Sequence, residues 1–137
     1  MSGLSLALQD AILTTLKNDA AVAAIVDKRV YDEPPSKGLV FPYITIGDGQ
    51  VLGDDTDGCG DGSEVFTQVH VWSREAGYPQ AKEIADAVRT ALKSSTPSLD
   101  GFDVTVVEFV QMQHLRDPDG KTRHAIVEFR YLVTHLT

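Results

Sequence analysis

The chain has 137 residues, of which 42% are hydrophobic and 23% are charged, which predicts one globular domain spanning residues 1–137. The net charge of −8 argues against nucleic-acid binding, because a binding site needs Lys and Arg to neutralise phosphates. The charge does not argue against a protein past which DNA moves without binding. Its single cysteine, Cys59, excludes an intrachain disulfide framework. No apolar run approaches the ~20 residues of a membrane span, and the N-terminus lacks the basic start of a signal peptide, so synthesis in the cytosol is expected.

Two helices are expected at the N-terminal end of the chain. Large apolar residues recur every four positions from Leu4 to Leu16, a helical period that predicts a helix over residues 4–18. Asp19 follows directly and can cap a short second helix that runs to Val26. The chain therefore begins with a helical pair.

Two or three strands follow this pair. Residues 29–31 are a candidate short strand, and the stretch FPYITIG predicts another, with Pro42 at its start where a missing N–H is tolerated. Apolar and polar residues alternate from Glu64 to Trp72, which predicts a strand with one buried face. Between these strands lies GDDTDGCGDG, residues 53–62, which has no apolar periodicity and predicts a surface loop.

A long amphipathic helix and a β-hairpin complete the chain. Pro79 suits the first turn of a helix that runs to about Lys93. Residues 102–134 predict a hairpin around the turn Asp117–Gly120, in which Gly120 takes a positive φ and Asp117 faces Lys121. The pairs that this register predicts are Val106–Leu132, Val107–Tyr131, Glu108–Arg130, Phe109–Phe129, Met112–Ile126 and His114–His124.

This order of elements predicts an α+β fold, with a mainly antiparallel sheet of about four strands and two main helices packed on it. The odd-numbered hairpin face, which includes Phe129 and Tyr131, is apolar enough to be the helix-covered side. The even-numbered face still carries a surplus of apolar residues, namely Phe102, Val104, Val106, Val110, Met112, Ile126 and Leu132. Either another subunit or the N-terminal helix would cover that second face, and the sequence leaves both open.

The aspartate-rich loop is the stretch that most resembles a ligand site. An EF-hand frame that starts at Asp57 puts Cys59 at its third position and Gln68 at its twelfth, where calcium needs oxygen ligands. A calcium- or metal-binding module that uses this loop and nearby histidines is therefore a remote alternative. The predicted pair His114–His124 supplies two ligands, and the spacing specifies no third.

Catalytic signatures are missing from the sequence. No serine lies in a nucleophile elbow, and no glycine-rich loop of the phosphate-binding type occurs. Cys59 has no basic neighbour that would lower its pKa, and Glu64, Glu108 and Glu128 are typical strand-surface charges. We therefore expect no enzymatic activity, no catalytic residues, no bound metal and no cofactor.

Several residues are candidates for contacts with another protein chain. Trp72 and Arg74 stand at the end of a strand, and both residue types are enriched where interfaces concentrate their binding energy. Arg116, Asp117 and Arg123 belong to a hairpin tip that carries charges of both signs. Such a tip is equally typical of a solvated turn and of one that docks on a partner.

Three stretches together resemble a known family. They are RVYDEPP followed by FPYITIG (residues 29–47), VHVWSREAGYPQAKEIADAVRTAL (69–92) and RDPDGKTRHAIVEFRYLV (116–133). Their order and spacing resemble the tail-completion, or tail-terminator, proteins of long-tailed bacteriophages and phage-like gene-transfer particles. The Asp/Gly loop is more acidic than the family pattern, so the resemblance gives it no role.

The resemblance implies a structural virion protein that forms a ring, expected to be a hexamer, with a tail tube protein and a head-tail connector protein as its other partners. The ring would sit at the head-proximal end of the tail after assembly in the host cytoplasm, with no membrane contact and with DNA passing through its lumen. Acidic side chains in the lumen would repel phosphate over roughly 8 Å. Apart from the resemblance, the acidic character of the loop makes Asp54, Asp55, Asp57 and Asp61 candidates to face such a lumen or a neighbouring subunit.

Two neighbouring roles in the same particle fit the resemblance almost as well. The chain could instead be a head-completion adaptor or a tail tube subunit, because small α+β domains without catalytic signatures suit all three positions. The sequence alone separates these roles poorly.

Overall fold

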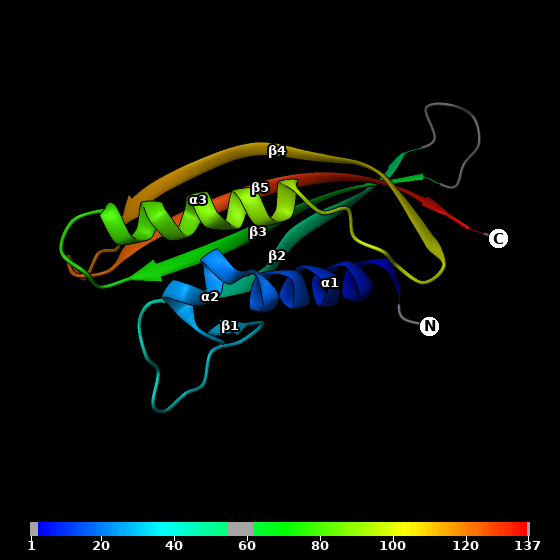
Figure 1. The fold of residues 1–137 in the computed structure, drawn as a ribbon. Helices are drawn as coiled ribbons and strands as arrows, with labels where there is room; N and C mark the ends of the chain where they lie inside the picture. The colour runs from blue at the N-terminus through cyan, green and yellow to red at the C-terminus, as the bar shows by residue number, and fades with distance from the viewer. Residues whose placement is uncertain (1–2, 55–61, 137) are drawn as a thin grey trace.

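The computed structural model describes residues 3–54 and 62–136. In this part of the chain, a five-stranded sheet of order β1-β2-β3-β5-β4 packs against three helices (Figure 1). The α+β prediction is confirmed, with a two-residue strand added to the expected four. The elements in chain order are α1 (Leu4–Asn18), α2 (Ala20–Val26), β1 (Val30–Tyr31), β2 (Tyr43–Asp54), β3 (Gly62–Ser73), α3 (Pro79–Lys93), β4 (Phe102–Arg116) and β5 (Arg123–His135).

The helices form where the sequence predicts them. In α1 the buried residues are the four-residue repeat Leu4, Leu8, Ile12 and Leu16, and α3 begins at Pro79 as expected. The carboxylate of Asp19 accepts a hydrogen bond of 3.1 Å from the Val22 N–H, which caps α2. Local signals thus mark the starts of α2 and α3, whereas α1 is stabilised by the packing of its buried repeat.

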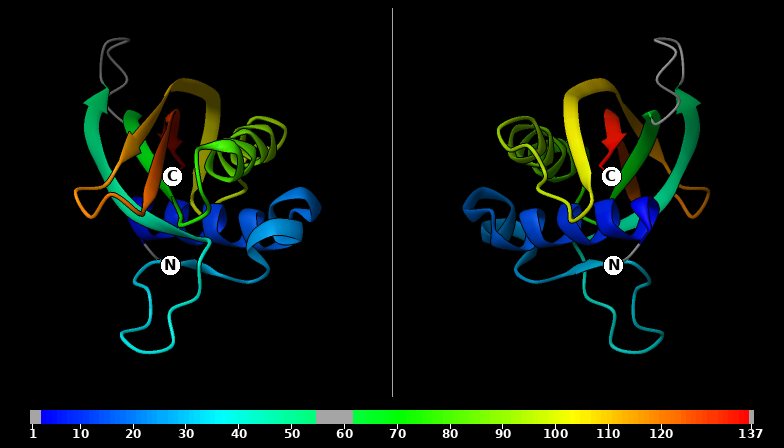
Figure 2. Two further views of the ribbon diagram at one scale, coloured as in Figure 1. Left: turned by 90° about the vertical axis from the view of Figure 1, so that its left-hand side faces the viewer. Right: turned by 90° about the vertical axis from the view of Figure 1, so that its right-hand side faces the viewer.

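One hydrophobic core lies between the helices and one face of the sheet. It combines the buried stripe of α1 with Val88 and its neighbours on α3 and with odd-numbered residues of β3 and β5, including Phe129 and Tyr131. The predicted helix-covered face is therefore confirmed. Because α1 packs on this same face (Figure 2), the alternative in which the N-terminal helix covers the second face is excluded.

The hairpin register agrees with the prediction in its middle and departs from it near the turn. The four predicted pairs from Val106–Leu132 to Phe109–Phe129 are confirmed. A β-bulge then shifts β4 by one position, so that Met112 pairs with Val127 and His114 with Ala125. The predicted Met112–Ile126 and His114–His124 pairs are therefore wrong.

The hairpin turn explains this shift. Asp117 does not face Lys121 but donates its N–H to the carbonyl of Thr122 at 2.9 Å, so the turn holds one residue more than predicted. The bulge at Val110 compensates for the added residue and restores the pairing further along the strands. Gly120 has a φ of 72°, as the turn chemistry predicts.

A second bulge lets β2 run beyond its predicted end. The pairing of β2 with β3 shifts between Ile46 and Gly49, and the strand then continues to Asp54. A side chain at Gly49 would collide with the carbonyl oxygen of Phe66, so glycine is required at this close approach. The bulge places Asp48 beside β3. Gly53, Asp54 and Gly62, expected in the loop at residues 53–62, belong instead to β2 and β3, and residues 55–61 lie outside the described residues.

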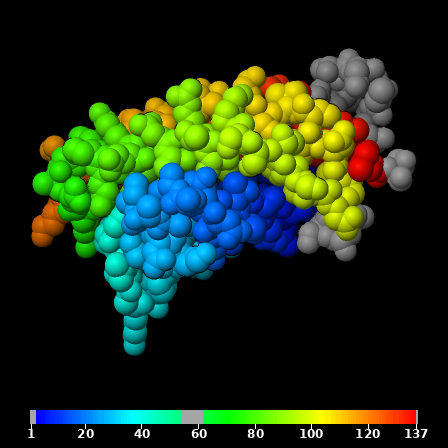
Figure 3. Space-filling model, in the orientation of Figure 1, coloured from blue at the N-terminus to red at the C-terminus, as the bar shows by residue number. Residues whose placement is uncertain are grey.

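The long strands give the molecule two distinct ends (Figure 1). The β4–β5 turn and the β3–α3 connection lie at one end, and Asp54, Gly62 and the start of β4 lie at the other. Residues 32–42 project from the body of the molecule as a separate loop (Figure 3). No helix in residues 3–54 and 62–136 is long and apolar enough to cross a membrane.

Candidate interaction surface

The helix-free face of the sheet, called here the open face, carries a mixture of apolar, aromatic and charged side chains. Its residues are half-buried or exposed rather than fully buried along β3, β5 and β4, apart from Tyr43 at the start of β2. The apolar members are Leu52, Phe66, Val106, Leu115, Ile126 and Leu132. A sheet that faced only water would carry mainly polar side chains here, so this face is a candidate contact surface.

Two histidines meet on the open face, near the end of the sheet that holds the hairpin turn. Nδ1 of His70 on β3 lies 2.7 Å from Nε2 of His124 on β5. Nε2 of His70 lies 3.0 Å from the Asp48 carboxylate, and Nδ1 of His124 lies 4.0 Å from the Asp117 carboxylate. Burial lowers the pKa of His70, which Asp48 raises in part. Burial and the neighbouring His70 both lower the pKa of His124.

An aromatic stack continues from this pair. The ring of Trp72 lies 3.8 Å from the ring of His124, centroid to centroid, with an angle of 13° between the planes. The indole N–H donates to the Thr45 hydroxyl at 3.0 Å, and Tyr43 stacks at 6.2 Å from Trp72. The predicted contact residue Trp72 is therefore held rigidly, with one edge on the open face.

The far half of the open face is charged. Arg130 on β5 forms an ion pair and hydrogen bond with Glu64 on β3 and lies 3.7 Å from Glu108 on β4. The Gln111 amide donates to the Glu128 carboxylate at 2.9 Å. The predicted Glu108–Arg130 pair is thus part of a three-strand network.

The remaining predicted contact residues gather at the end of the sheet that holds the hairpin turn. The guanidinium group of Arg74 lies over the Phe41 ring at 4.3 Å and 3.9 Å from the Asp119 carboxylate. Arg123 lies over the ring of Tyr78 at 5.5 Å and pairs across the hairpin with Arg116. Arg74 and Arg123 are therefore already ordered by intramolecular contacts, which limits the entropy lost when a partner binds.

Asp54, the member of the predicted acidic set that the structure describes, lies apart from this cluster. Asp54 ends β2 at the opposite end of the sheet (Figure 1). Asp55, Asp57 and Asp61 fall outside the described residues, so their predicted placement toward a lumen or neighbour stays a prediction. Of the acidic set, only Asp54 is thus placed, at the end of the sheet opposite the hairpin turn.

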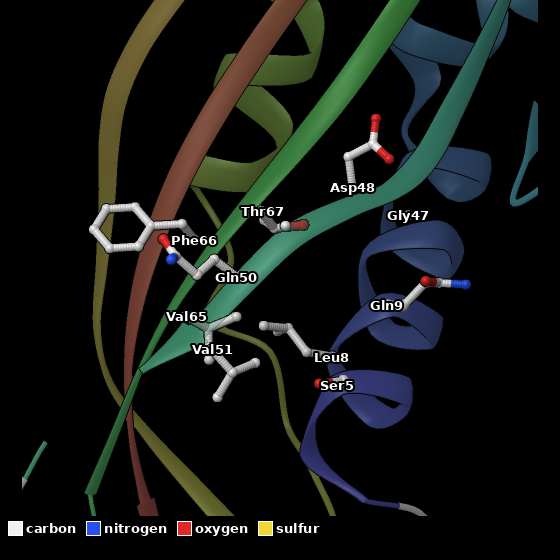
Figure 4. A pocket seen from close by; sticks show the side chains of 11 residues that line it. Ser5, Leu8, Gln9, Gly47, Asp48, Gln50, Val51, Val65, Phe66 and Thr67 are labelled. Carbon is white, nitrogen blue, oxygen red and sulfur yellow. The ribbon is translucent and has the colours of Figure 1, made fainter. Parts of the chain in front are cut away.

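A shallow hollow of about 260 Å³ lies beside the β2 bulge (Figure 4). Ser5, Leu8 and Gln9 of α1 line one side, and Asp48 and Val65 belong to the opposite side. Within residues 3–54 and 62–136, no three His, Cys, Asp or Glu side chains are grouped closely enough to hold a metal ion. The hollow shows no convergent chemistry of the kind that a catalytic pocket needs.

The sequence did not reveal His70 or Asp48 as members of a cluster. His70 reads as one polar position of an alternating strand, and its partner His124 is 54 residues away in the chain. The Gly47-Asp48-Gly49 triplet did hold a signal, because glycines within a strand often mark a bulge. Only the pairing of β2 with β3 shows that this bulge approaches His70, and only the pairing of β3 with β5 brings His124 beside it.

Comparison with known proteins identifies the family. Residues 10–134 match the family model described as tail completion protein gp17. The chain belongs to the tail completion protein gp17 family. The family is a structural one, so the expectation of a non-enzymatic virion protein rests on this match as well as on the sequence.

Individual relatives and solved structures extend the comparison. The tail completion protein gp17 of Bacillus phage SPP1 is 28% identical over 131 residues, which cover 96% of this chain and 95% of that protein. Its solved structure aligns with a TM-score of 0.61 over 95% of both chains. A chain in the structure of the virion of a native gene transfer agent particle, also 28% identical, aligns with a TM-score of 0.89 over 98% of this chain and 99% of that one.

Proposed function

We propose that this chain forms a hexameric ring that terminates the tail tube and joins it to the head-side connector, with DNA passing through the lumen. The observation that carries the proposal is the open face of a tail completion fold. Its six apolar side chains lie on strands with no helix covering them, and a second copy of the chain would bury them.

The two outer edges of the sheet support a ring rather than a two-fold dimer. β1 pairs with β2 only at Ile44 and Thr45, so the outer edge of β2 from Gly49 to Asp54 has no strand partner in the described part of the chain. β4 forms the other outer edge over its whole length. Two different edges on opposite sides of one subunit are the arrangement that a closed, head-to-tail ring needs.

Net charge supports the role of DNA as passing cargo. At −8 per subunit, a ring would carry a strongly negative field that keeps phosphate backbones from adhering. Binding to DNA would instead need a groove rich in lysine and arginine. The tail tube protein and the connector protein are therefore proposed as the ring's binding partners.

The oligomeric state tests this proposal. Native mass spectrometry and light scattering at micromolar concentration, with and without purified tail tubes, should detect a six-subunit species. A matched pair of variants tests the surface: Leu132→Asp places a charge on the open face, and Thr90→Asp places the same charge on the exposed side of α3. We expect the first to abolish the ring and the second to leave it intact, with similar melting temperatures.

A strict monomer that also fails to assemble on tail tubes would refute the ring. Assembly unchanged in Leu132→Asp would show that the open face is not the subunit interface. Cryo-electron microscopy of the particle then decides the position, because a head-completion adaptor or a tail tube subunit would appear elsewhere along the axis.

A further inference from the structure

Four residues from four separate segments form a continuous polar chain across the open face, called here the histidine clasp. They are Asp48 from the β2 bulge, His70 from β3, His124 from β5 and Asp117 from the hairpin turn. Both histidine side chains are 13% exposed. The family assignment gives these residues no role, and the ring proposal does not depend on them.

The distances in the histidine clasp select the position of each proton. The Asp48 carboxylate, 3.0 Å from Nε2 of His70, favours a proton on that nitrogen and leaves Nδ1 of His70 as an acceptor. Nε2 of His124, 2.7 Å from Nδ1 of His70, then carries the proton shared between the two rings. Nδ1 of His124 is left without a proton. Its distance of 4.0 Å from the Asp117 carboxylate is long enough for the two unprotonated atoms to face each other.

As pH falls, the histidine clasp therefore takes up two further protons, one after the other. The first proton enters at Nδ1 of His124, creates a cation that faces Asp117, and leaves the contact between the histidines intact. The second enters at Nδ1 of His70 and sets two N–H donors of two cations against each other at 2.7 Å. That arrangement is repulsive, so the two rings must separate.

We propose that the histidine clasp is a proton-operated switch on the open face. Protonation of His124 draws Asp117 and the hairpin turn toward the sheet, and protonation of His70 then parts the two rings and disrupts the stack with Trp72. After both histidines are protonated, the His70 imidazolium still lies beside Asp48 and the His124 imidazolium beside Asp117. These carboxylates balance the two positive charges, so the rings separate while the protein stays folded.

One further carboxylate lies beside the histidine clasp among the described residues, because Asp32 lines a small hollow together with Thr45, Asp48 and His70. Asp32 would therefore add to the stabilisation of a protonated His70. The titratable Tyr43 stacks on Trp72, and burial raises its pKa. β2 contributes the neutral Thr45, and β4 places the apolar Leu115 opposite His124. The nearest guanidinium groups are held elsewhere, that of Arg74 by Phe41 and Asp119 and that of Arg123 by Tyr78. The helices pack on the other face of the sheet.

Trp72 makes the switch directly observable. It is the only tryptophan in the chain, and its ring lies 3.8 Å from His124, so indole emission reports on this pair alone. We expect the fluorescence of the wild-type protein to change as pH falls from about 8 to about 5, with a midpoint below the usual histidine value of about 6.5. His124→Gln should abolish this transition, because it removes the ring stacked on Trp72. His70→Gln should remove the second step and leave only the first, at His124.

His135→Gln is the matched control, because His135 ends β5 near Phe102, at the other end of the sheet. It should leave the transition unchanged. An emission that does not depend on pH in the wild-type protein, or a transition that persists in His124→Gln, would overturn the proposal. Loss of the transition in His135→Gln would do the same.

Stability provides a second measurement that does not rely on fluorescence. Both histidines have a lowered pKa in the folded protein, so below about pH 6.5 the unfolded chain takes up protons more readily. The melting temperature of the wild-type protein should therefore fall more between about pH 7 and about pH 5 than that of the double variant His70→Gln/His124→Gln. Equal declines in the two proteins would contradict the switch.

Discussion

Asp119 organises the hairpin turn through its side chain. One carboxylate oxygen accepts the N–H groups of Lys121 and Thr122, each at 2.9 Å, and the other accepts the Thr122 hydroxyl at 2.7 Å. These bonds, first the one from the Thr122 N–H, lower the pKa of Asp119 to about 2. The charged carboxylate therefore stabilises the turn, and with it the position of Asp117 in the histidine clasp.

Replacing Asp119 gives a pH-dependent prediction. Because the pKa is about 2 in the folded chain and 3.8 as the ordinary value, the stabilisation is complete above 3.8 and is lost as pH falls toward 2. Asp119→Asn should lower the urea midpoint at about pH 5, and its difference from the wild-type protein should shrink at about pH 3. A difference that stays constant with pH would show that charge on this side chain is unimportant.

Phe129 tests the assignment of the buried face at the same scale. Its ring is fully buried and packs edge-on against Phe109, with 5.8 Å between the ring centroids. We expect Phe129→Ala to lower the free energy of unfolding by about 3–5 kcal/mol, because it leaves a cavity in the core. The exposed Thr134 on the same strand provides the control, and Thr134→Ala should change stability by no more than about 0.5 kcal/mol. Equal effects in urea denaturation would contradict the buried face.

At the scale of single elements, β-bulges decide which side chains reach the open face. The bulge between Val104 and Val106 puts Val104 into the core, so its predicted position on the second face is wrong. Two further bulges act closer to the histidine clasp. The bulge at Val110 exchanges the faces to which the side chains in the last part of β4 point. Met112 therefore packs against the core, while Gln113 and Leu115 lie on the open face. The bulge between Ile46 and Gly49 brings Asp48 to His70. Without these two irregularities, the histidine clasp would lose Asp48, and the open face would gain a methionine.

The β4 bulge can be tested with two adjacent residues. Met112→Asn should destabilise the protein by about 1–3 kcal/mol, because it places an amide where apolar atoms pack. Gln113→Asn should change stability by no more than about 0.5 kcal/mol, because this exposed side chain lies on the open face. Chemical denaturation of both variants measures the contrast. The reverse order would mean that β4 continues to the turn without a bulge.

At the scale of the whole molecule, charge and apolar surface act against each other. Each subunit carries a net charge of −8, so bringing copies together is opposed by long-range repulsion. The apolar side chains of the open face favour association, and salt screens the repulsion without weakening that contribution. The proposed ring is therefore held by short-range contacts against an electrostatic cost.

This balance predicts how assembly depends on salt. The fraction of protein in the ring should rise as ionic strength increases from about 0.01 M to about 0.15 M, where the screening length falls from about 30 Å to about 8 Å. Light scattering at fixed protein concentration measures this fraction. Dissociation of the ring on adding salt would show instead that ion pairs between subunits hold it together.

Local sequence signals predicted the elements well. Helical periodicity placed α1 and α3 at their observed positions, and Asp19 and Pro79 marked helix starts through their own backbone preferences. Cross-strand complementarity also gave the central hairpin pairs, including Glu108–Arg130. These features depend on residues close together in the chain or joined by one turn, so a single sequence contains enough information to derive them.

The sequence by itself determined the α+β class, the absence of catalytic motifs and the resemblance to tail-completion proteins. Only the tertiary structure decided which face stays open, where β4 shifts its register, and that His124 meets His70 rather than His114. The reason is physical. Bulges and contacts between distant strands depend on how the whole sheet packs and twists, and no local periodicity encodes that packing.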